Sequence, residues 1–595
     1  MSLSYLATTP ISSPTTTISG NPLPRSAINT CRSIRLSNRT PYTSCQLNQQ
    51  NQEPTRNGSI DRRNLLFGLG GLYGTAAVTK NAFGKPLQPF DSSTCHDATD
   101  LVTGEKVHCC PPYKTANMVD FTPPSPRDRL RIRKPAHKYN SDDIAKFEAA
   151  IAKMKALPDN HPWSFKQQAA IHCTYCDGAF YQLNTKTELQ VHQSWFFLPW
   201  HRYYLYFWER ILGKLIGDDT FAIPYWNWDT REGMWFPKMY QKSTSPLYDE
   251  ARNTDHYNKL MHYGCEEEYC NRKKTDELIT YNLARIFKTF QGDNLKIPSL
   301  FMGNETRAGE ESVGGGSLEQ LLHNGIHVWV GQPNSPYHDM ANFVTAARDP
   351  VFFAHHGNVD RMWYIYTQLR KWSGETGRFK YESDWLESAF VFYDENHQVV
   401  KVKVKNCLTP ESLGYTYDSA ETHEWASIRR KYKKLRNIAE QNRREGDSLK
   451  LNPASEFGSK PRNLTEPIRA LVQRPPTSGT KDEKQDSVEV LFIEDIIVPH
   501  GSPARFDVYV AKATAEGQVG EGEFAGSFVN VPHSNHESSN GAHGSSLQLG
   551  ISSLLKDIDT EASEELVVSL IPRNGEVTVG GVKVGLVHVN YDDDV

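Results

Sequence analysis

The chain has 595 residues, more than one hydrophobic core usually holds, so at least two folded parts are expected. An apolar content of 38% is typical of a globular protein, and a formal net charge of -4 excludes the strongly basic field of a nucleic-acid-binding protein. No apolar run reaches the ~20 residues of a membrane-spanning helix, so no integral membrane segment is expected.

The first 84 residues have the composition of a targeting segment. From Met1 to Ile60 the only acidic residue is Glu53, and Ser, Thr, Asn and Pro are abundant. Arg62-Arg63 precede the short apolar stretch Leu65 to Val78, as in a twin-arginine export signal. The pattern predicts a plastid transit region over residues 1–84, with delivery to the chloroplast thylakoid lumen. The alternative is a disordered tail with a chance arginine pair.

The cysteines are grouped rather than spread. Five of the ten lie between residues 95 and 176: Cys95, Cys109, Cys110, Cys173 and Cys176. Adjacent cysteines do not readily pair with each other, so Cys109 and Cys110 are expected to reach different partners in an oxidising compartment. A zinc site built from four cysteines is the alternative, although only the last two have Cys-x-x-Cys spacing. Cys265 and Cys270 are a further candidate pair.

Helical spacing of apolar residues recurs through the middle of the chain. The helical stretches are Ser141 to Leu157, Ser164 to Tyr181, His201 to Ile216, Ser317 to Trp329 and Asp349 to Trp372. Glycine and proline fall between them. This spacing predicts a mainly α domain with long loops over residues 85–420.

The pattern changes after residue 420. Residues 421–486 carry Pro, Gly, Ser and mixed charges with few apolar anchors, which predicts a linker. Alternating apolar residues then predict strands near Val488–Phe492 and Arg505–Val510. Two alternating runs flank Gly580-Gly581 within Val577–Val584, which predicts a hairpin. Residues 487–595 are therefore expected to form a separate β-rich domain.

Two clusters of histidine lie in the helical part. The first is His172, His192 and His201, and the second is His323, His327 and the pair His355-His356. Residues four apart on a helix share a face, so His323 and His327 are expected to point the same way. Six neutral imidazoles without thiolate or carboxylate ligands suit copper better than a di-iron or zinc-protease site.

The chain resembles the plant polyphenol oxidases of the tyrosinase and catechol oxidase family, from its leader to its C-terminus. The motifs are Phe197-Leu-Pro-Trp-His-Arg202, Asp349 to Arg361, Asp384-Trp-Leu386, Tyr415-Thr-Tyr417 and Arg505-Phe-Asp-Val508. The last has Arg where the family usually has Lys. The resemblance implies a four-helix-bundle dicopper catalytic domain with long loops, followed by a separate β-sandwich-like C-terminal domain that shields the site.

The resemblance also assigns the metal ligands. One copper is expected on His172, His192 and His201, and the other on His323, His327 and His356. The family's last ligand stands four residues before an Asp, here Asp360, so His356 is preferred and His355 lies behind it.

Other roles follow from the same resemblance. It implies a thioether between Cys176 and His192, and disulfides Cys95–Cys110 and Cys109–Cys173. Phe343 matches a gate residue over one copper. Glu319 and Asn324 match a pair that orients the water that takes the proton of a monophenol.

The implied activity is oxidation of o-diphenols to o-quinones with O2 reduced to water, with ortho-hydroxylation of monophenols also permitted. The partners are small phenols, O2 and a processing protease that opens a latent form. A haemocyanin-like reversible O2 carrier is the alternative, and a copper-depleted storage protein is a third possibility.

Overall fold

The computed structural model describes residues 85–589, except for residues 91, 101, 113–116, 126–128, 265–273, 375–380, 419–422, 429–451, 454–460, 476–486, 500, 514–518 and 533–541. The targeting segment expected over residues 1–84 and the candidate pair Cys265 and Cys270 lie outside the described residues. Among the described helices, none combines the length and apolar content needed to cross a membrane.

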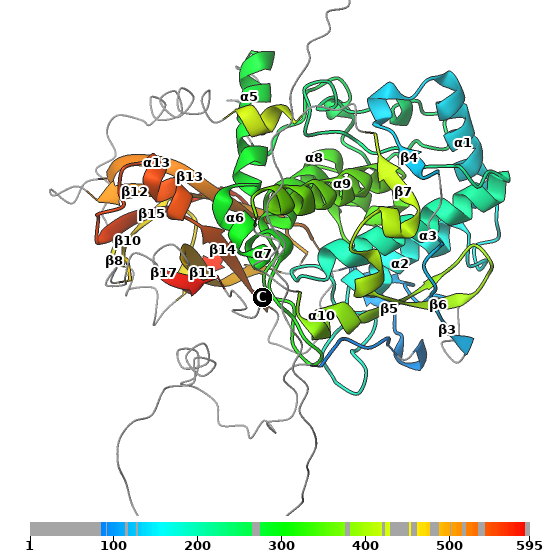
Figure 1. The fold of residues 1–595 in the computed structure, drawn as a ribbon, viewed down its shortest axis with the longest axis horizontal. Coiled ribbons are helices and arrows are strands. Elements are labelled where there is room, and N and C mark those ends of the chain that lie inside the picture. The colour runs from blue at the N-terminus through cyan, green and yellow to red at the C-terminus, as the bar shows by residue number, and fades with distance from the viewer. Residues whose placement is uncertain are drawn as a thin grey trace, which may run out of the picture. The chain divides into compact units, whose positions relative to one another are not determined.

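The main helices lie between residues 141 and 372, and all but α5 fall on the stretches that the sequence predicts (Figure 1). They are α1 (Ser141–Lys155), α2 (Phe165–Cys176), α3 (Phe197–Ile216), α5 (Thr275–Thr289), α8 (Asn324–Val330) and α9 (Val351–Trp372). A π-helical turn over Leu318–His323 leads directly into α8. Short helices follow the long ones as α6 (Gly292–Lys296), α7 (Pro298–Met302) and α10 (Ser383–Glu387).

The helix ends differ from the expected ones for local reasons. Ser164 is the N-cap of α2, and its side chain accepts a hydrogen bond from the Gln167 N–H (3.2 Å), so the helix begins one residue later. Helix α3 begins four residues earlier than expected, at Phe197, because Pro199 is tolerated in a first turn where its missing N–H has no partner to lose.

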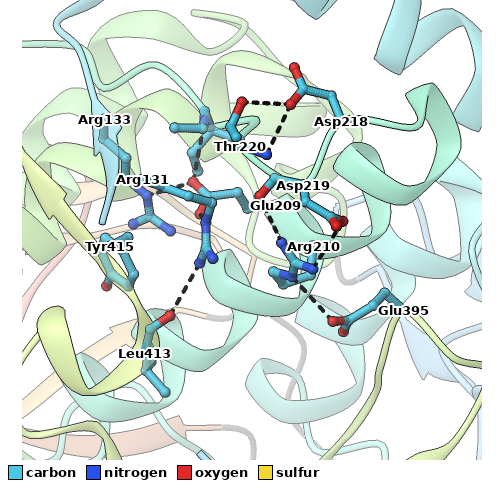
Figure 2. Close-up of polar contacts among 12 residues, drawn as sticks. Arg131, Arg133, Glu209, Arg210, Asp218, Asp219, Thr220, Glu395, Leu413 and Tyr415 are labelled. Carbon is cyan, nitrogen blue, oxygen red and sulfur yellow. Dashed lines mark hydrogen bonds and ion pairs between the residues drawn. The ribbon is translucent and has the colours of Figure 1, made fainter. Parts of the chain in front are cut away.

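Helix α3 is fastened by a buried ion network (Figure 2). Arg131 and Arg133, on β4 (Arg131–Arg133), donate to the Glu209 carboxylate of α3 at 3.0 and 2.8 Å. Arg202 of α3 donates to Asp360 of α9 at 2.5 Å. Strand β4 pairs with β7 (Tyr415–Tyr417), so the network joins α3 and α9 to the segment around residue 415.

The N-terminal segment is tied down covalently. Cys95 pairs with Cys110, and Cys109 pairs with Cys173 of α2, as the resemblance implied. Cys176 and Cys407 are buried and outside these disulfides. Short strands complete this region: β1 (Ala98–Thr99) pairs with β2 (Lys106–Val107), and β6 (Val399–Lys403) lies between β3 (Val119–Asp120) and β5 (Ala389–Tyr393).

The C-terminal region consists of two sheets that share one apolar core (Figure 1). The first has the order β13-β12-β15-β10-β8, and the second has the order β14-β11-β16-β9 with β17 also on β11. Their bounds are β8 (Asn452–Pro453), β9 (Arg462–Asn463), β10 (Ile468–Gln473), β11 (Ser487–Pro499), β12 (Ala504–Ala513), β13 (Val519–Asn530), β14 (Ala542–Gly550), β15 (Glu565–Asn574), β16 (Thr578–Val579) and β17 (Gly581–His588). Helix α13 (Ser552–Asp557) follows β14.

The range expected as a linker, residues 421–486, contains strands of these sheets. Strand β10 pairs with β15 along its whole length, and β8 pairs with β10. Ile468, Ala470 and Val472 are buried on one face of β10, an alternation that the surrounding polar residues obscure in the sequence. The β-rich region therefore starts before residue 487.

The hairpin predicted around Gly580-Gly581 is wrong. Strands β16 and β17 pair with β11 rather than with each other. The register of β11 shifts between Ile493 and Ile496, and Gly580 lies beside Asp495 where a Cβ would collide. The two glycines thus lie where the chain between β16 and β17 passes the register shift of β11. Glycines at such a shift and glycines in a turn look the same in an alternating sequence pattern.

Candidate metal centre

The first three predicted ligands come together although they lie on different segments. His172 is on α2, His201 is near the start of α3, and His192 is in the loop between these helices. Each offers a ring nitrogen, and the three nitrogens lie within 4.8 Å of one another. All three side chains are at most 2% exposed.

The second triad converges more tightly. The His356 Nε2 lies 3.2 Å from the His323 Nε2 and 3.4 Å from the His327 Nε2. The π-helical turn ends at His323, and α8 carries His327, so both rings face α9 and its His356. These three nitrogens and one of His355 lie within 4.8 Å of one another with no carboxylate among them, so the site is histidine-only.

Four of the imidazoles are oriented by hydrogen bonds at their other nitrogen. The Nδ1 atoms of His172, His201 and His327 lie 2.9, 2.7 and 2.9 Å from the backbone oxygens of Phe343, Phe197 and Met340. The His323 Nδ1 lies 2.8 Å from the Asn324 Oδ1. An Nδ1–H that donates to an oxygen leaves Nε2 free to bind the metal. Such an oxygen is the usual hydrogen-bond partner of a histidine that binds a metal.

Burial keeps these imidazoles neutral. Burial, with the neighbouring His327, lowers the pKa of His172 to about 3, and burial lowers the pKa of His327 to about 4. The pKa values of His201, His323 and His356 are also lowered well below the usual histidine value, chiefly by burial. Neutral imidazole is the form that binds a metal.

The two triads adjoin each other. The His201 and His356 rings stack with their centroids 4.2 Å apart, and the His192 and His323 centroids are 5.8 Å apart. Within the described residues, the buried Nε2 atoms of His172 and His201 have no hydrogen-bond partner, an arrangement that costs stability unless a metal fills it. Six neutral imidazoles in two adjoining sets fit a pair of copper ions.

His355 is placed behind the second triad. Its Nδ1 lies 3.2 Å from the Trp228 Nε1, which donates to it, and its ring stacks on His323 with centroids 5.2 Å apart. An Nδ1 that accepts from Trp228 carries no proton. A ring nitrogen of His355 also lies within 4.8 Å of those of His323, His327 and His356, so the choice of His356 as the ligand rests on the resemblance.

Cys176 and His192 share a neighbour. The Gln190 amide donates to the Cys176 carbonyl oxygen (2.6 Å) and accepts from the His192 N–H (2.9 Å). Cys176 lies one turn beyond His172 at the end of α2, and its side chain is fully buried. These bonds hold the loop that carries His192 against the end of the helix.

The Phe343 ring lies among the ligands of both triads. It stacks on His192 with centroids 4.2 Å apart and meets the His172 and His327 rings edge to face at 5.9 and 5.5 Å. Its side chain is 5% exposed.

Glu319 and Asn324 have different partners. The buried Glu319 carboxyl accepts from the Gln193 N–H at 2.8 Å. Burial raises the pKa of Glu319 to about 8, and the bond from Gln193 partly opposes that shift. The Asn324 Oδ1 faces His323, and its Nδ2 donates to the Val529 carbonyl of β13 (2.7 Å). Glu319 thus lies beside His192 and Asn324 beside His323.

The site also contains groups that the sequence did not reveal. Residues 529–532, named here the covering segment, come from the C-terminal sheets. The Pro532 carbonyl accepts from the Phe343 N–H (2.8 Å), and the Val529 N–H donates to the Gln320 Oε1 (3.4 Å). These are backbone contacts between distant parts of the chain, so no residue type in the segment could have indicated them.

Family comparisons divide the chain in the same way. The common central domain of tyrosinase matches residues 162–369, which contain all six histidines. The polyphenol oxidase middle domain matches residues 381–431, and the chloroplastic polyphenol oxidase C-terminal domain matches residues 460–586. Together with the paired histidine triads, these matches define a tyrosinase-type oxidoreductase with an added strand-rich region.

Comparison with individual named proteins identifies the family within this class. A protein of Malus domestica named polyphenol oxidase, chloroplastic, is 42% identical over 560 residues, 91% of this chain and 92% of the relative. The (+)-larreatricin hydroxylase, chloroplastic, of Larrea tridentata is 40% identical over 570 residues, 92% of this chain and 95% of that protein. The solved structure of latent apple tyrosinase has a TM-score of 0.69 and 41% identity, and the match covers 79% of this chain and 99% of that chain. This chain belongs to the plant polyphenol oxidases.

Proposed function

We propose that the chain is a latent, copper-dependent oxidase that converts o-diphenols to o-quinones. Two diphenols and one O2 give two quinones and two waters, so each phenol loses two electrons and two protons. The observation that supports this most directly is the convergence of the His323, His327 and His356 Nε2 atoms beside the second triad. Copper bound there would carry electrons between phenol and O2.

The protein groups around that site would fix ligands, substrate and protons. The four helices that carry or flank the triads, α2, α3, α8 and α9, would form the bundle around the two ions. A thioether between Cys176 and His192 would restrict the loop ligand, and the shared contacts to Gln190 support their proximity. The Phe343 ring, stacked on His192, would hold a phenol ring by stacking.

Monophenol hydroxylation is the finer part of the proposal. A monophenol must lose its proton before its oxygen can bind a metal. Glu319 and Asn324 would orient a water that takes this proton, once the Asn324 amide is free of Val529. Burial raises the pKa of Glu319, whereas the Gln193 N–H favours its ionised form. The hydroxylase named among the relatives supports this assignment.

The division of the chain is part of the same proposal. Residues 1–84 would direct the chain to the plastid and then to the thylakoid lumen, in keeping with relatives named chloroplastic. Residues 85–420 would be catalytic, and the C-terminal sheets would shield the site until a protease cuts the connection. The latent apple enzyme supports this arrangement.

The direct test is O2 uptake by the copper-loaded chain, after opening, across mono- and diphenols. Quinone formation with one O2 consumed for two diphenols is expected, and the copper-free chain is the control. Reversible O2 binding without quinone would favour an O2 carrier instead. Failure to hold copper after reconstitution would indicate a storage protein.

A further inference from the structure

The covering segment touches the metal centre through its backbone. Val529, Val531 and Pro532 are buried. The Val529 carbonyl accepts from the Asn324 Nδ2 at 2.7 Å, and the Pro532 carbonyl accepts from the Phe343 N–H at 2.8 Å.

Each contact is one residue away from a ligand of a different triad. The Asn324 amide that donates to Val529 accepts from His323 through its Oδ1, 2.8 Å from the His323 Nδ1. Phe343, held at its N–H, accepts from the His172 Nδ1 at its own carbonyl, 2.9 Å away. The segment therefore reaches one ligand of each proposed copper through a single intervening residue.

We infer that the Val529 and Pro532 carbonyls are positioning groups for both metals. They hold Asn324 and Phe343, and through them the imidazoles of His323 and His172. This inference rests on the proposed copper function. Outer partners of ligating histidines change metal affinity by about 10- to 100-fold, so departure of the segment changes the metal centre as well as opening it. The Asn324 amide has an added effect, because donation at Nδ2 strengthens Oδ1 as an acceptor.

A second feature holds the segment in place. Val529 is the cross-strand partner of Arg505 in the β12–β13 pair. The Arg505 guanidinium lies against Gly264 in the position that a Cβ would take, and its Nη2 donates to the Tyr263 carbonyl (3.3 Å). Nearby, the buried Lys288 and Glu523 form an ion pair at 2.6 Å between α5 and β13. Only glycine at position 264 leaves room for Arg505.

The test is a Gly264→Ala substitution in the full-length chain. The added methyl takes the place of the Arg505 guanidinium, so Arg505 loses its bond to the Tyr263 carbonyl and no longer ties β12, with its partner residue Val529, to the helical region. The matched control is Gly217→Ala, because Gly217 has a similar φ of +70° but nothing within 4 Å of a Cβ. A second full-length variant, Val529→Ser with Val531→Ser, removes the apolar burial of the segment without touching the ligands.

Two measurements separate positioning from simple blocking. Competition with a chromophoric Cu(I) chelator gives copper affinity, and NMR of the Cu(I) form gives the imidazole N–H signals. We expect copper affinity about tenfold weaker in Gly264→Ala and in the serine variant, with shifted N–H signals for His172 and His323. Gly217→Ala should match the unsubstituted chain in both.

The other outcomes overturn the inference. Faster phenol oxidation with unchanged copper affinity and unchanged N–H signals would reduce the segment to a passive cover. No change of any kind in either variant would refute the seating of the segment by Arg505 and its apolar side chains. A chain that binds no copper in any form would instead refute the proposed function.

Discussion

At the scale of single residues, the pair His355-His356 shows how neighbours take different roles. The His356 Nε2 meets those of His323 and His327, whereas the His355 Nδ1 accepts from Trp228. The helical rotation of about 100° between successive residues separates the two rings. Sequence spacing alone leaves such a doublet ambiguous, and the preference for His356 comes from the family motif through Asp360.

The number of copper ions bound per chain should depend on His356 but not on His355. His356→Asn removes one of three converging nitrogens, so copper is expected to fall from two ions to about one per chain. His355→Asn is the control and should retain both ions, because it removes only a ring behind the site. Atomic absorption after dialysis measures the difference, and equal copper loss in the two variants would contradict the assignment.

Asn324 offers a test of the proton-transfer role. In the opened enzyme, Asn324→Ala should lower the monophenol rate by about 100-fold, while the diphenol rate changes much less. Asn324→Asp is the comparison, since it keeps an oxygen for the His323 Nδ1 but loses the amide donor. Steady-state rates with matched mono- and diphenols give the ratio. An unchanged ratio in Asn324→Ala would argue against the oriented water.

At the scale of elements, the sequence predicted the helices that carry the ligands, because apolar spacing and histidine motifs coincide there. It did not predict the π-helical turn at Leu318–His323, which has no distinctive residue pattern. It also missed β10 and misread β16 and β17, because strand pairing depends on distant partners. The contacts of the covering segment with the metal centre could not be predicted either, because they also join distant parts of the chain.

Helix α3 depends on a charge that the sequence gives no reason to single out. Glu209 is buried between Arg131 and Arg133, and although burial opposes ionisation, the two cations lower its pKa overall. Glu209→Gln leaves two buried guanidinium groups poorly paired, so the free energy of unfolding should fall by about 3–5 kcal/mol.

The control for Glu209 is the ion pair of Arg210, the next residue of α3. Glu395 is partly exposed and binds Arg210 at 3.1 Å (Figure 2). Arg210 keeps Asp219 as a second partner, so Glu395→Gln should cost at most about 1 kcal/mol. Urea denaturation followed by tryptophan fluorescence compares the two variants. Equal losses would mean that the Glu209 network does not anchor α3.

At the scale of the whole molecule, acid should loosen the C-terminal sheets. Asp507 is buried, which alone would raise its pKa, but Arg505, Arg573 and Arg285 outweigh burial and lower the pKa. A carboxyl with a lower pKa in the folded chain stabilises it fully above its unfolded pKa of about 4, and this stabilisation is lost as the pH falls further.

The pH dependence can be assigned by substitution. The protection factors of the β12 amides, which are exchange rates corrected for the pH dependence of a free amide, should fall between pH 5 and pH 3 in the unsubstituted chain. Asp507→Asn should exchange faster already at pH 6 and change less across that window, whereas the exposed Asp559→Asn should behave like the parent. A parent-like pH profile in Asp507→Asn would exclude these ion pairs as the acid-sensitive element.

Where the chain is cut should matter for opening. Because β8 and β10 belong to the C-terminal sheets, a chain that ends before Asn452 loses that region as a unit. Its diphenol oxidation should exceed that of the full-length chain by at least tenfold, since the covering segment is absent. A cut after Gln473 should open the site less cleanly, because it separates β10 from β15. Equal activity of the full and shortened chains would contradict shielding.

The order of the segments along the chain has one more consequence. Every proposed ligand precedes residue 357, whereas the covering segment comes from residues 529–532. During synthesis from the N-terminus, all six proposed ligands are therefore made before the covering segment. Metal that binds during synthesis would therefore meet uncovered histidines. Metal that reaches the complete protein can bind only after the covering segment moves away.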